Sequence, residues 1–208
     1  MATGEDNRRG FLTGAVTFIG AIWAAGRTAA AQLTPNAAEG PFYPTEPMRV
    51  ADADNDLVKV VGLVREAGGE VITLKGRISD KAGRPRAGYR IEIWQCDVNG
   101  KYIHPGDRRT VQYDRGFQGF GHDITDAQGR YSFRTIKPGS YPGRTPHIHV
   151  KVLERDREVL TTQFYEAGNP GNKRDSLYRR MSPAEARNVS MTYVEVSGGI
   201  ETTVNIVV

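Results

Sequence analysis

Short stretches of alternating apolar and polar residues follow one another from position 71 to the end of the chain. Successive side chains of a strand point to opposite faces of a sheet, so a half-buried strand shows a period of two. Residues 90–95 alternate in this way, and 71–78 is rich in β-branched and apolar residues. The pattern predicts strands over 71–78, 90–95, 131–136, 147–153, 161–165, 191–196 and 202–208.

Turn-forming residues separate these stretches, for example at 80–85, 99–100 and 125–129. Only 182–188 has a helical pattern, in which Ser182 can cap the helix and Pro183 takes its first position. Many short strands with little helix are typical of a sandwich of two sheets. We therefore expect an all-β fold over 71–208, a β-sandwich of the transthyretin- or immunoglobulin-like kind. The residues before it, 32–70, include a proline-rich stretch and predict an extended N-terminal arm.

The first 31 residues have the layout of an export signal. Arg8 and Arg9 precede an apolar run from Ala15 to Ala25, and small residues follow up to Ala31. Such a run is too short to span a bilayer and is typical of a signal peptide. The arginine pair favours the twin-arginine route over an ordinary secretory signal or a retained anchor. We expect cleavage after Ala31, no stable membrane span afterwards, and a periplasmic or extracellular protein.

Composition narrows the possible functions. A hydrophobic fraction of 38% and a charged fraction of 25% fit a folded globular protein. The formal charge of +4 is spread along the chain without a basic block, so we expect no nucleic-acid partner. The single cysteine, Cys96, excludes an intrachain disulfide and any site built from several cysteines. Nothing in the composition indicates an oligomeric state.

The stretch from His147 to Val152 offers the first candidate ligands. Because side chains alternate along a strand, Ile148, Val150 and Val152 share one face and suit a core. His147 and His149 share the other face, one strand repeat apart, where both imidazoles can bind one metal ion. Two surface histidines without any shared function would give the same sequence pattern.

Two tyrosines are further candidate ligands, one next to this strand in the sequence and one next to an earlier turn. Tyr141 sits in a loop stiffened by Pro138, Pro142 and Pro146, directly before His147, and Tyr102 follows the turn at 99–100. A tyrosine is most often a packing residue with a solvated hydroxyl, so neither one alone indicates a site. The same residues also allow two functions other than a metal site built from histidines and tyrosines. One is a non-catalytic transthyretin-like binding module, and the other is a zinc hydrolase that takes His104, His122 or Asp123 as a third ligand.

Several motifs, taken together and in order, resemble the intradiol ring-cleavage dioxygenases. They lie at 76–83, 91–97, 100–104, 117–121, 125–142 and 144–149, and the likeness extends over roughly residues 34–170. The resemblance implies a β-sandwich in which one Fe(III) per chain is bound by two tyrosines and two histidines. By motif position these ligands are Tyr102, Tyr141, His147 and His149.

The resemblance also implies the reaction and two further residues. The substrates would be a small catechol and O2, and the aromatic ring would be cleaved between its two hydroxylated carbons to a cis,cis-muconate-type product. Arg144 would stabilise negative charge on the ring, and Gln163 would help to position it. Tyrosine titrates near pH ~10, so two phenolates at neutral pH need a strong Lewis acid such as Fe(III).

The chain departs from the family pattern in three places. We expect it to lack the long N-terminal helical segment of the catechol-type members. The loop from Tyr141 to His147 is short, and Gly143 stands where protocatechuate-type members carry a bulky aromatic residue. These differences predict a more open pocket that tolerates substituted catechols.

Overall fold

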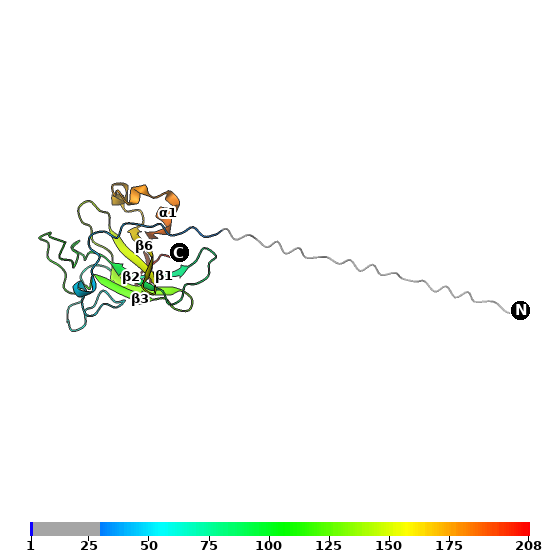
Figure 1. Cartoon of the computed structure of the whole chain (residues 1–208), viewed down its shortest axis with the longest axis horizontal. Helices are drawn as coiled ribbons and strands as arrows, with labels where there is room; N and C mark the ends of the chain where they lie inside the picture. Colours follow the sequence, from blue (N-terminus) through cyan, green and yellow to red (C-terminus); the bar gives the residue numbers. More distant parts are fainter. Residues whose placement is uncertain (2–29) are drawn as a thin grey trace.

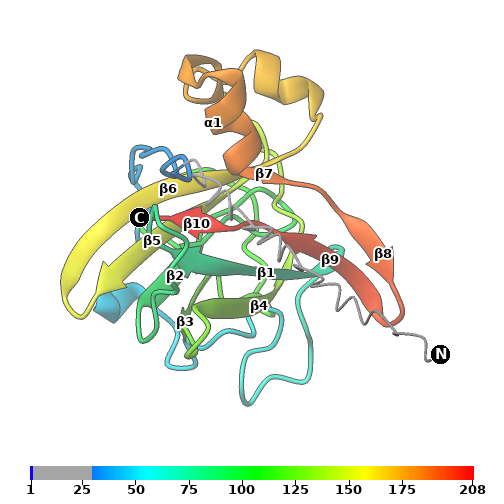
Figure 2. The ribbon, with the colours of Figure 1, turned by 90° about the vertical axis from the view of Figure 1, so that its right-hand side faces the viewer.

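Two β-sheets of five strands each form the body of the protein (Figures 1 and 2). The structure is a computed structural model that describes Met1 and residues 30–208. The predicted export signal therefore lies, apart from its ends, outside the described residues. No helix among the described residues is long and apolar enough to cross a membrane.

The first sheet is built around a central strand, β1, which pairs with β4 on one side and with β9 and β10 on the other. Its strands are β1 (Val71–Ser79), β4 (Arg130–Ile136), β8 (Val194–Val196), β9 (Gly199–Thr203) and β10 (Ile206–Val207). The order in the second sheet is β3-β2-β5-β6-β7. Its strands are β2 (Arg90–Trp94), β3 (Phe120–Ile124), β5 (His147–Glu154), β6 (Arg157–Glu166) and β7 (Ser190–Met191).

Helical structure is sparse among the described residues. It consists of the 3-10 turns η1 (Glu46–Met48), η2 (Pro170–Lys173) and η3 (Tyr178–Arg180) and the helix α1 (Pro183–Asn188). Ser182 and Glu185 form a capping box at the start of α1, which satisfies backbone donors that a helix leaves free. Figure 2 shows α1 beside β7, far from β3. The predicted all-β class with little helix is confirmed.

The main core lies between the two sheets. Leu74 and Phe133 of the first sheet belong to the same buried cluster as Ile148, Val150 and Val152 of β5, as the alternation predicted. Burial of apolar surface stabilises this layer by about 25 cal/mol per Å². The opposite face of β5 therefore looks away from the core, and it carries His147 and His149.

A second, smaller apolar cluster covers part of that outer face. Trp94, Cys96, Tyr102 and Phe120 are buried there. Residues of the N-terminal arm, among them Phe42 and Tyr43, pack against them. The arm is thus a cover for the second sheet, and it lies on the side that carries the two histidines.

The structure differs from the predicted strands in three places. β3 was not predicted, because Gly121, His122 and Asp123 interrupt any clean alternation. The single strand predicted over 191–196 is two strands: β7 pairs with β6 in the second sheet, and β8 pairs with β9 in the first. The strand predicted over 202–208 is likewise divided between β9 and β10. A crossing between sheets leaves no mark on local periodicity.

Candidate metal centre

The two histidines of β5 lie side by side and are almost completely buried. His147 is 1% exposed and His149 is 2% exposed. Their Nε2 atoms are 3.1 Å apart. His149 also stacks on Trp94 of the neighbouring strand β2, with ring centroids 4.8 Å apart and planes inclined by 10°. The strand repeat and this stacking fix both rings.

The two tyrosines meet the same point from two different loops. The hydroxyl of Tyr102 is 3.5 Å from Nε2 of His147, and the hydroxyl of Tyr141 is 3.3 Å from the same atom. Tyr102 is buried and Tyr141 is half-buried. The structure therefore brings together all four residues that the motifs singled out as ligands.

Close contact between the two loops makes this meeting possible. Gly100 has a φ of 73°, and a Cβ atom there would lie 2.3 Å from the carbonyl oxygen of Ser140. Only glycine adopts this backbone conformation cheaply and leaves room for the neighbouring chain. Asp107 accepts a hydrogen bond from the backbone N–H of Tyr102 at 2.9 Å and holds that loop in place.

The hydrogen bonds of His147 decide which of its nitrogen atoms is free. Nδ1 lies 2.7 Å from the carbonyl oxygen of Thr145. A carbonyl only accepts, so Nδ1 donates its hydrogen and Nε2 keeps a lone pair directed at the other three donors. Metal–nitrogen bonds are about 2 Å long, and donors that share one ion lie roughly 3 Å apart. The two nitrogen and two oxygen atoms here fit that spacing.

Burial sets the protonation of these groups in the protein alone. It raises the pKa of Tyr102 well above its usual value and raises that of Tyr141, although Arg144 opposes the shift at Tyr141. Burial lowers the pKa of His147 to about 4, and burial together with the charges of His147 and Arg144 lowers the pKa of His149 well below its usual value. The histidines are therefore neutral and ready to donate. A strongly positive ion is what would make both phenolates stable here.

No third ligand of the kind a zinc hydrolase needs lies beside the histidines. Among residues 30–208, no three His, Cys, Asp or Glu side chains come together in a way that could hold a metal ion. Nδ1 of His104 accepts the N–H of Gly106, and Asp123 accepts the N–H of Ser132. The zinc-hydrolase reading has no support in this geometry.

Arg144 and Gln163 lie next to the four donors and contact each other. Arg144 donates to Oε1 of Gln163 at 2.5 Å and, through Nε, to Asp175 at 2.8 Å. Gln163 is directly opposite His149 in the β5–β6 register. The motifs predicted a place near the site for both residues. They did not predict Asp175, which belongs to no motif and lies in a loop after η2.

The N-terminal arm forms one wall of the site. Phe42 stacks on Tyr102 with ring centroids 4.7 Å apart. Gly40 has a φ of 79°, and a Cβ atom there would lie 3.2 Å from Cε1 of His149. Gln163 donates to the carbonyl oxygen of Ala38 at 2.8 Å. Sequence reasoning recognised the arm as extended but gave no sign that it covers the histidines.

Comparison with known proteins identifies the family. The family model described as "Dioxygenase" matches residues 38–181, which include all four donors. The chain belongs to the intradiol ring-cleavage dioxygenase family.

The relatives of this family member have names of ring-cleavage enzymes. The chain is 36% identical over 156 residues to a protocatechuate 3,4-dioxygenase beta chain from Burkholderia cepacia, over 71% of this chain and 65% of that protein. It is 31% identical over 123 residues to a catechol 1,2-dioxygenase from Candida albicans, over 50% of this chain and 39% of that protein. The matches thus span less than two thirds of these curated relatives.

Solved structures agree with the fold of this family member. The dioxygenase domain of a dioxygenase–carbohydrate-binding fusion protein from Streptomyces sp. SirexAA-E superimposes with a TM-score of 0.64 and 34% identity. The match covers 85% of this chain and 98% of that one. A catechol 1,2-dioxygenase from Acinetobacter sp. ADP1 has a TM-score of 0.60 and 25% identity, over 84% of this chain and 62% of that one.

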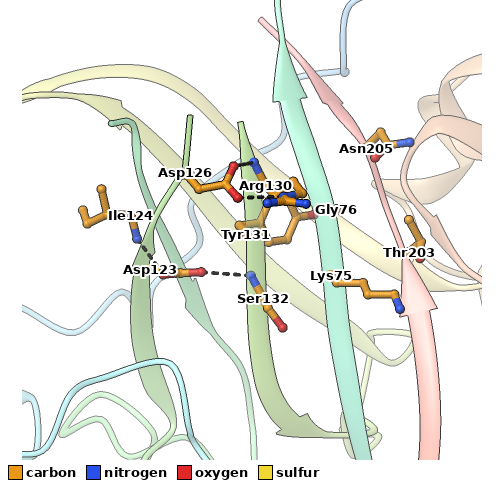
Figure 3. A pocket seen from close by; sticks show the side chains of 10 residues that line it. All are labelled: Lys75, Gly76, Asp123, Ile124, Asp126, Arg130, Tyr131, Ser132, Thr203 and Asn205. Atoms are coloured by element: carbon orange, nitrogen blue, oxygen red, sulfur yellow. Dashed lines mark hydrogen bonds and ion pairs between the residues drawn. The ribbon is translucent and has the colours of Figure 1, made fainter. Parts of the chain in front are cut away.

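Several hollows of similar size, about 470 to 610 Å³, lie on the surface of the described residues. One, of about 610 Å³, borders the donors and is lined by Tyr141, Gly143, Arg144 and residues of the η2 region. Another, of about 570 Å³, is lined by residues of β1, β3 and β4, by Asp126 and by the segment from Thr203 to Asn205, and by none of the four donors (Figure 3). Its polar groups already have partners: Asp126 binds Arg130, Asp123 accepts from Ser132, and Lys75 pairs with Glu201. Only the first hollow adjoins the candidate site.

Proposed function

We propose that this chain is a non-haem Fe(III) intradiol dioxygenase that cleaves catechol-type rings between their two hydroxylated carbons with O2. The products are of the cis,cis-muconate type. The observation that carries the proposal is the convergence of four donor atoms. The hydroxyls of Tyr102 and Tyr141 and Nε2 of His149 lie 3.1 to 3.5 Å from Nε2 of His147. A non-catalytic sandwich gives no reason for these four donors, three of them buried, to meet.

The donor set favours Fe(III) over divalent ions. Two phenolate oxygens are hard anions, and free tyrosine ionises only near pH ~10. A trivalent ion stabilises the phenolates and compensates for their burial, whereas a divalent ion would fill this site weakly. Held by these four residues, Fe(III) would supply the Lewis-acid chemistry that binds a catechol and makes its ring reactive towards O2.

Tyr141 is the residue best placed to receive a proton from the substrate. It is half-buried, it borders the hollow, and its loop is flanked by residues open to solvent. A catechol that binds through two oxygens must lose two protons, and the Tyr141 oxygen can take one of them. Tyr102 is buried beneath Phe42 and is better suited to a permanent ligand.

Arg144 supplies positive charge beside the ring. Its contacts with Asp175 and Gln163 fix the guanidinium before substrate binds, so no reorganisation is needed when negative charge develops on the ring. Gln163 is held in turn by Ala38 and by the hydroxyl of Tyr165, and it can position the bound ring. Phe42 and Trp94 exclude water from the donors and strengthen these electrostatic effects.

Metal content, colour and oxygen uptake test the proposal together. We expect one iron per chain, a broad visible absorption band, and O2 consumption with catechol, hydroxyquinol, protocatechuate or chlorocatechols. The exposed backbone at Gly143 leaves an open pocket, so several substituted catechols should react. Stoichiometric zinc without a visible band would refute the metal assignment, and activity on protocatechuate with catechol inert would refute the open pocket.

A further inference from the structure

We infer that Arg174 is a specificity-determining residue that attracts a negatively charged substituent, so that catechols with an anionic side arm are preferred over uncharged ones. The inference rests on the proposed function and adds a substrate class to it. Arg174 lies in the loop directly after η2 and lines the hollow beside the donors, together with Tyr141, Gly143 and Arg144.

The size of the hollow exceeds the need of a single aromatic ring. Its volume is about 610 Å³, and sites of roughly 300 to 1,000 Å³ enclose drug-sized ligands. Gly143 has a φ of 84°, and a Cβ atom there would meet nothing within 4 Å. The wall of the hollow is therefore open at position 143, although Arg144 and Thr145 of the same loop contact the η2 region. A substituent on a ring bound beside Tyr141 has space to extend towards Arg174.

The two arginines that line the hollow differ in whether a carboxylate neutralises their charge. Arg144 is paired with Asp175, whose side chain is fully buried. Asp175 also accepts from the backbone N–H groups of Thr145 and Leu177, so its oxygens are satisfied. Arg174 is exposed, and within residues 30–208 no carboxylate lies within ion-pair distance of it. The lining of the hollow therefore carries one uncompensated positive charge, and Arg174 provides it.

Arg174 provides the only charge in the lining that is free for a ligand, apart from any group outside the described residues. The hollow in Figure 3 offers no equivalent, because its positive side chains are paired, Arg130 with Asp126 and Lys75 with Glu201, and its remaining charge, Asp123, is negative. An exposed charge interacts weakly and is screened by salt. The expected contribution of Arg174 is therefore a preference of about fivefold, and it should fade at high ionic strength.

The experiment compares 3-(3,4-dihydroxyphenyl)propionate with its uncharged methyl ester. These two ligands differ in charge and share the ring. We would measure kcat/KM for both, and also their dissociation constants without O2 from the change in the visible spectrum. The variants are Arg174→Gln and Arg174→Glu. Arg179→Gln is the matched control, because Arg179 is an exposed arginine in η3 that does not line the hollow.

The decisive quantity is the ratio of acid to ester. For wild type we expect the acid to bind about fivefold better than the ester at low salt and almost equally at high salt. Arg174→Gln should abolish the preference, Arg174→Glu should reverse it, and Arg179→Gln should keep it. An unchanged ratio in Arg174→Glu, or an equal effect of Arg179→Gln, would overturn the inference. Failure of wild type to consume O2 with any catechol would instead contradict the proposed function, and the ratio of acid to ester dissociation constants, measured by calorimetry without O2, would still test Arg174.

Discussion

The carbonyl oxygen of Thr145 accepts the Nδ1–H of His147 at 2.7 Å, and this contact turns Nε2 of the histidine towards the other donors. Thr145 itself is fixed by Asp175, which accepts its backbone N–H at 3.0 Å. Asp175 also binds Arg144. One buried carboxylate thus connects the orientation of a proposed metal ligand with the placement of the proposed catalytic arginine.

Loss of a donor should reduce metal binding in a graded way. His147→Ala should cost most of the iron, because its Nε2 is the atom around which the other three donors gather. Tyr102→Phe and Tyr141→Phe should shift or weaken the visible band, since each removes one phenolate. Iron analysis and absorption spectra measure this. His122→Ala on β3 is the control, and an equal iron loss there would show that the effect is not specific.

Gly40→Ala should harm the site more than a comparable glycine change elsewhere. Gly40 and Gly83 have φ values of 79° and 78°, so alanine at either position carries the same backbone strain, roughly 1–2 kcal/mol. Only at Gly40 would the added Cβ meet a neighbour, His149, at 3.2 Å. Urea unfolding should therefore give similar losses of stability, whereas iron content should fall in Gly40→Ala alone. Equal iron content in the two variants would contradict the close approach of the arm.

Asp175→Asn should destabilise the protein at neutral pH. Burial by itself would raise the pKa of Asp175, but the N–H of Thr145 and the guanidinium of Arg144 outweigh burial and lower it. A carboxyl with a lowered folded-state pKa contributes stability above its unfolded pKa of about 3.9, and the contribution disappears as the pH falls through the folded value. Removal of one partner from a buried ion pair destabilises a protein by several kcal/mol. Because Arg144 is partly exposed, we expect Asp175→Asn to lower the free energy of unfolding by about 3 kcal/mol, the low end of that range.

Urea unfolding at pH 7 and below pH 4 tests this assignment. The difference between wild type and Asp175→Asn should be large at pH 7 and should shrink in acid. Asp126→Asn, at an exposed carboxylate paired with Arg130, is the control and should change stability far less. A difference that does not depend on pH would show that the Asp175 charge is not the cause.

Tyr43→Phe should loosen the N-terminal arm. The Tyr43 hydroxyl donates to the buried carboxylate of Glu92 at 2.7 Å, and it accepts from Arg49 at 3.0 Å. Loss of a hydrogen bond to a charged group costs about 1.5–3 kcal/mol, so limited proteolysis of the arm and iron release should both be faster by about tenfold or more. In Tyr193→Phe the lost hydroxyl is buried without a protein partner, so this control should behave like wild type. Identical proteolysis of the two variants would exclude a fastening role for Tyr43.

Replacement of Arg8 and Arg9 by lysine should block export. The arginine pair precedes an apolar run that Gly14, Thr17 and Gly20 keep only moderately hydrophobic, which favours twin-arginine transport of a folded protein. Cell fractionation of wild type and the double variant measures the outcome. Unchanged export would mean that the arginines serve only as a generic charged start, and the folded-export proposal would fail.

Local pattern was sufficient to predict the main strands. β5 was predicted over 147–153 and spans His147–Glu154, and its apolar face lies in the core. The period of two is a local property, so it can be read without knowledge of the partner strands. It failed at β3, whose central residues are Gly121, His122 and Asp123, and at 191–196, where the chain leaves one sheet for the other.

The sequence by itself determined that His147 and His149 share a face, because that follows from the geometry of one strand. Motif order added Tyr102, Tyr141, Arg144 and Gln163 as neighbours of that face. Only the tertiary structure decided how the tyrosines reach it: the Gly100 loop packs against Ser140 with room for no side chain. The cover formed by Phe42, the support from Asp175 and the free charge of Arg174 are also tertiary. They depend on contacts between residues far apart in the chain, which no local pattern records.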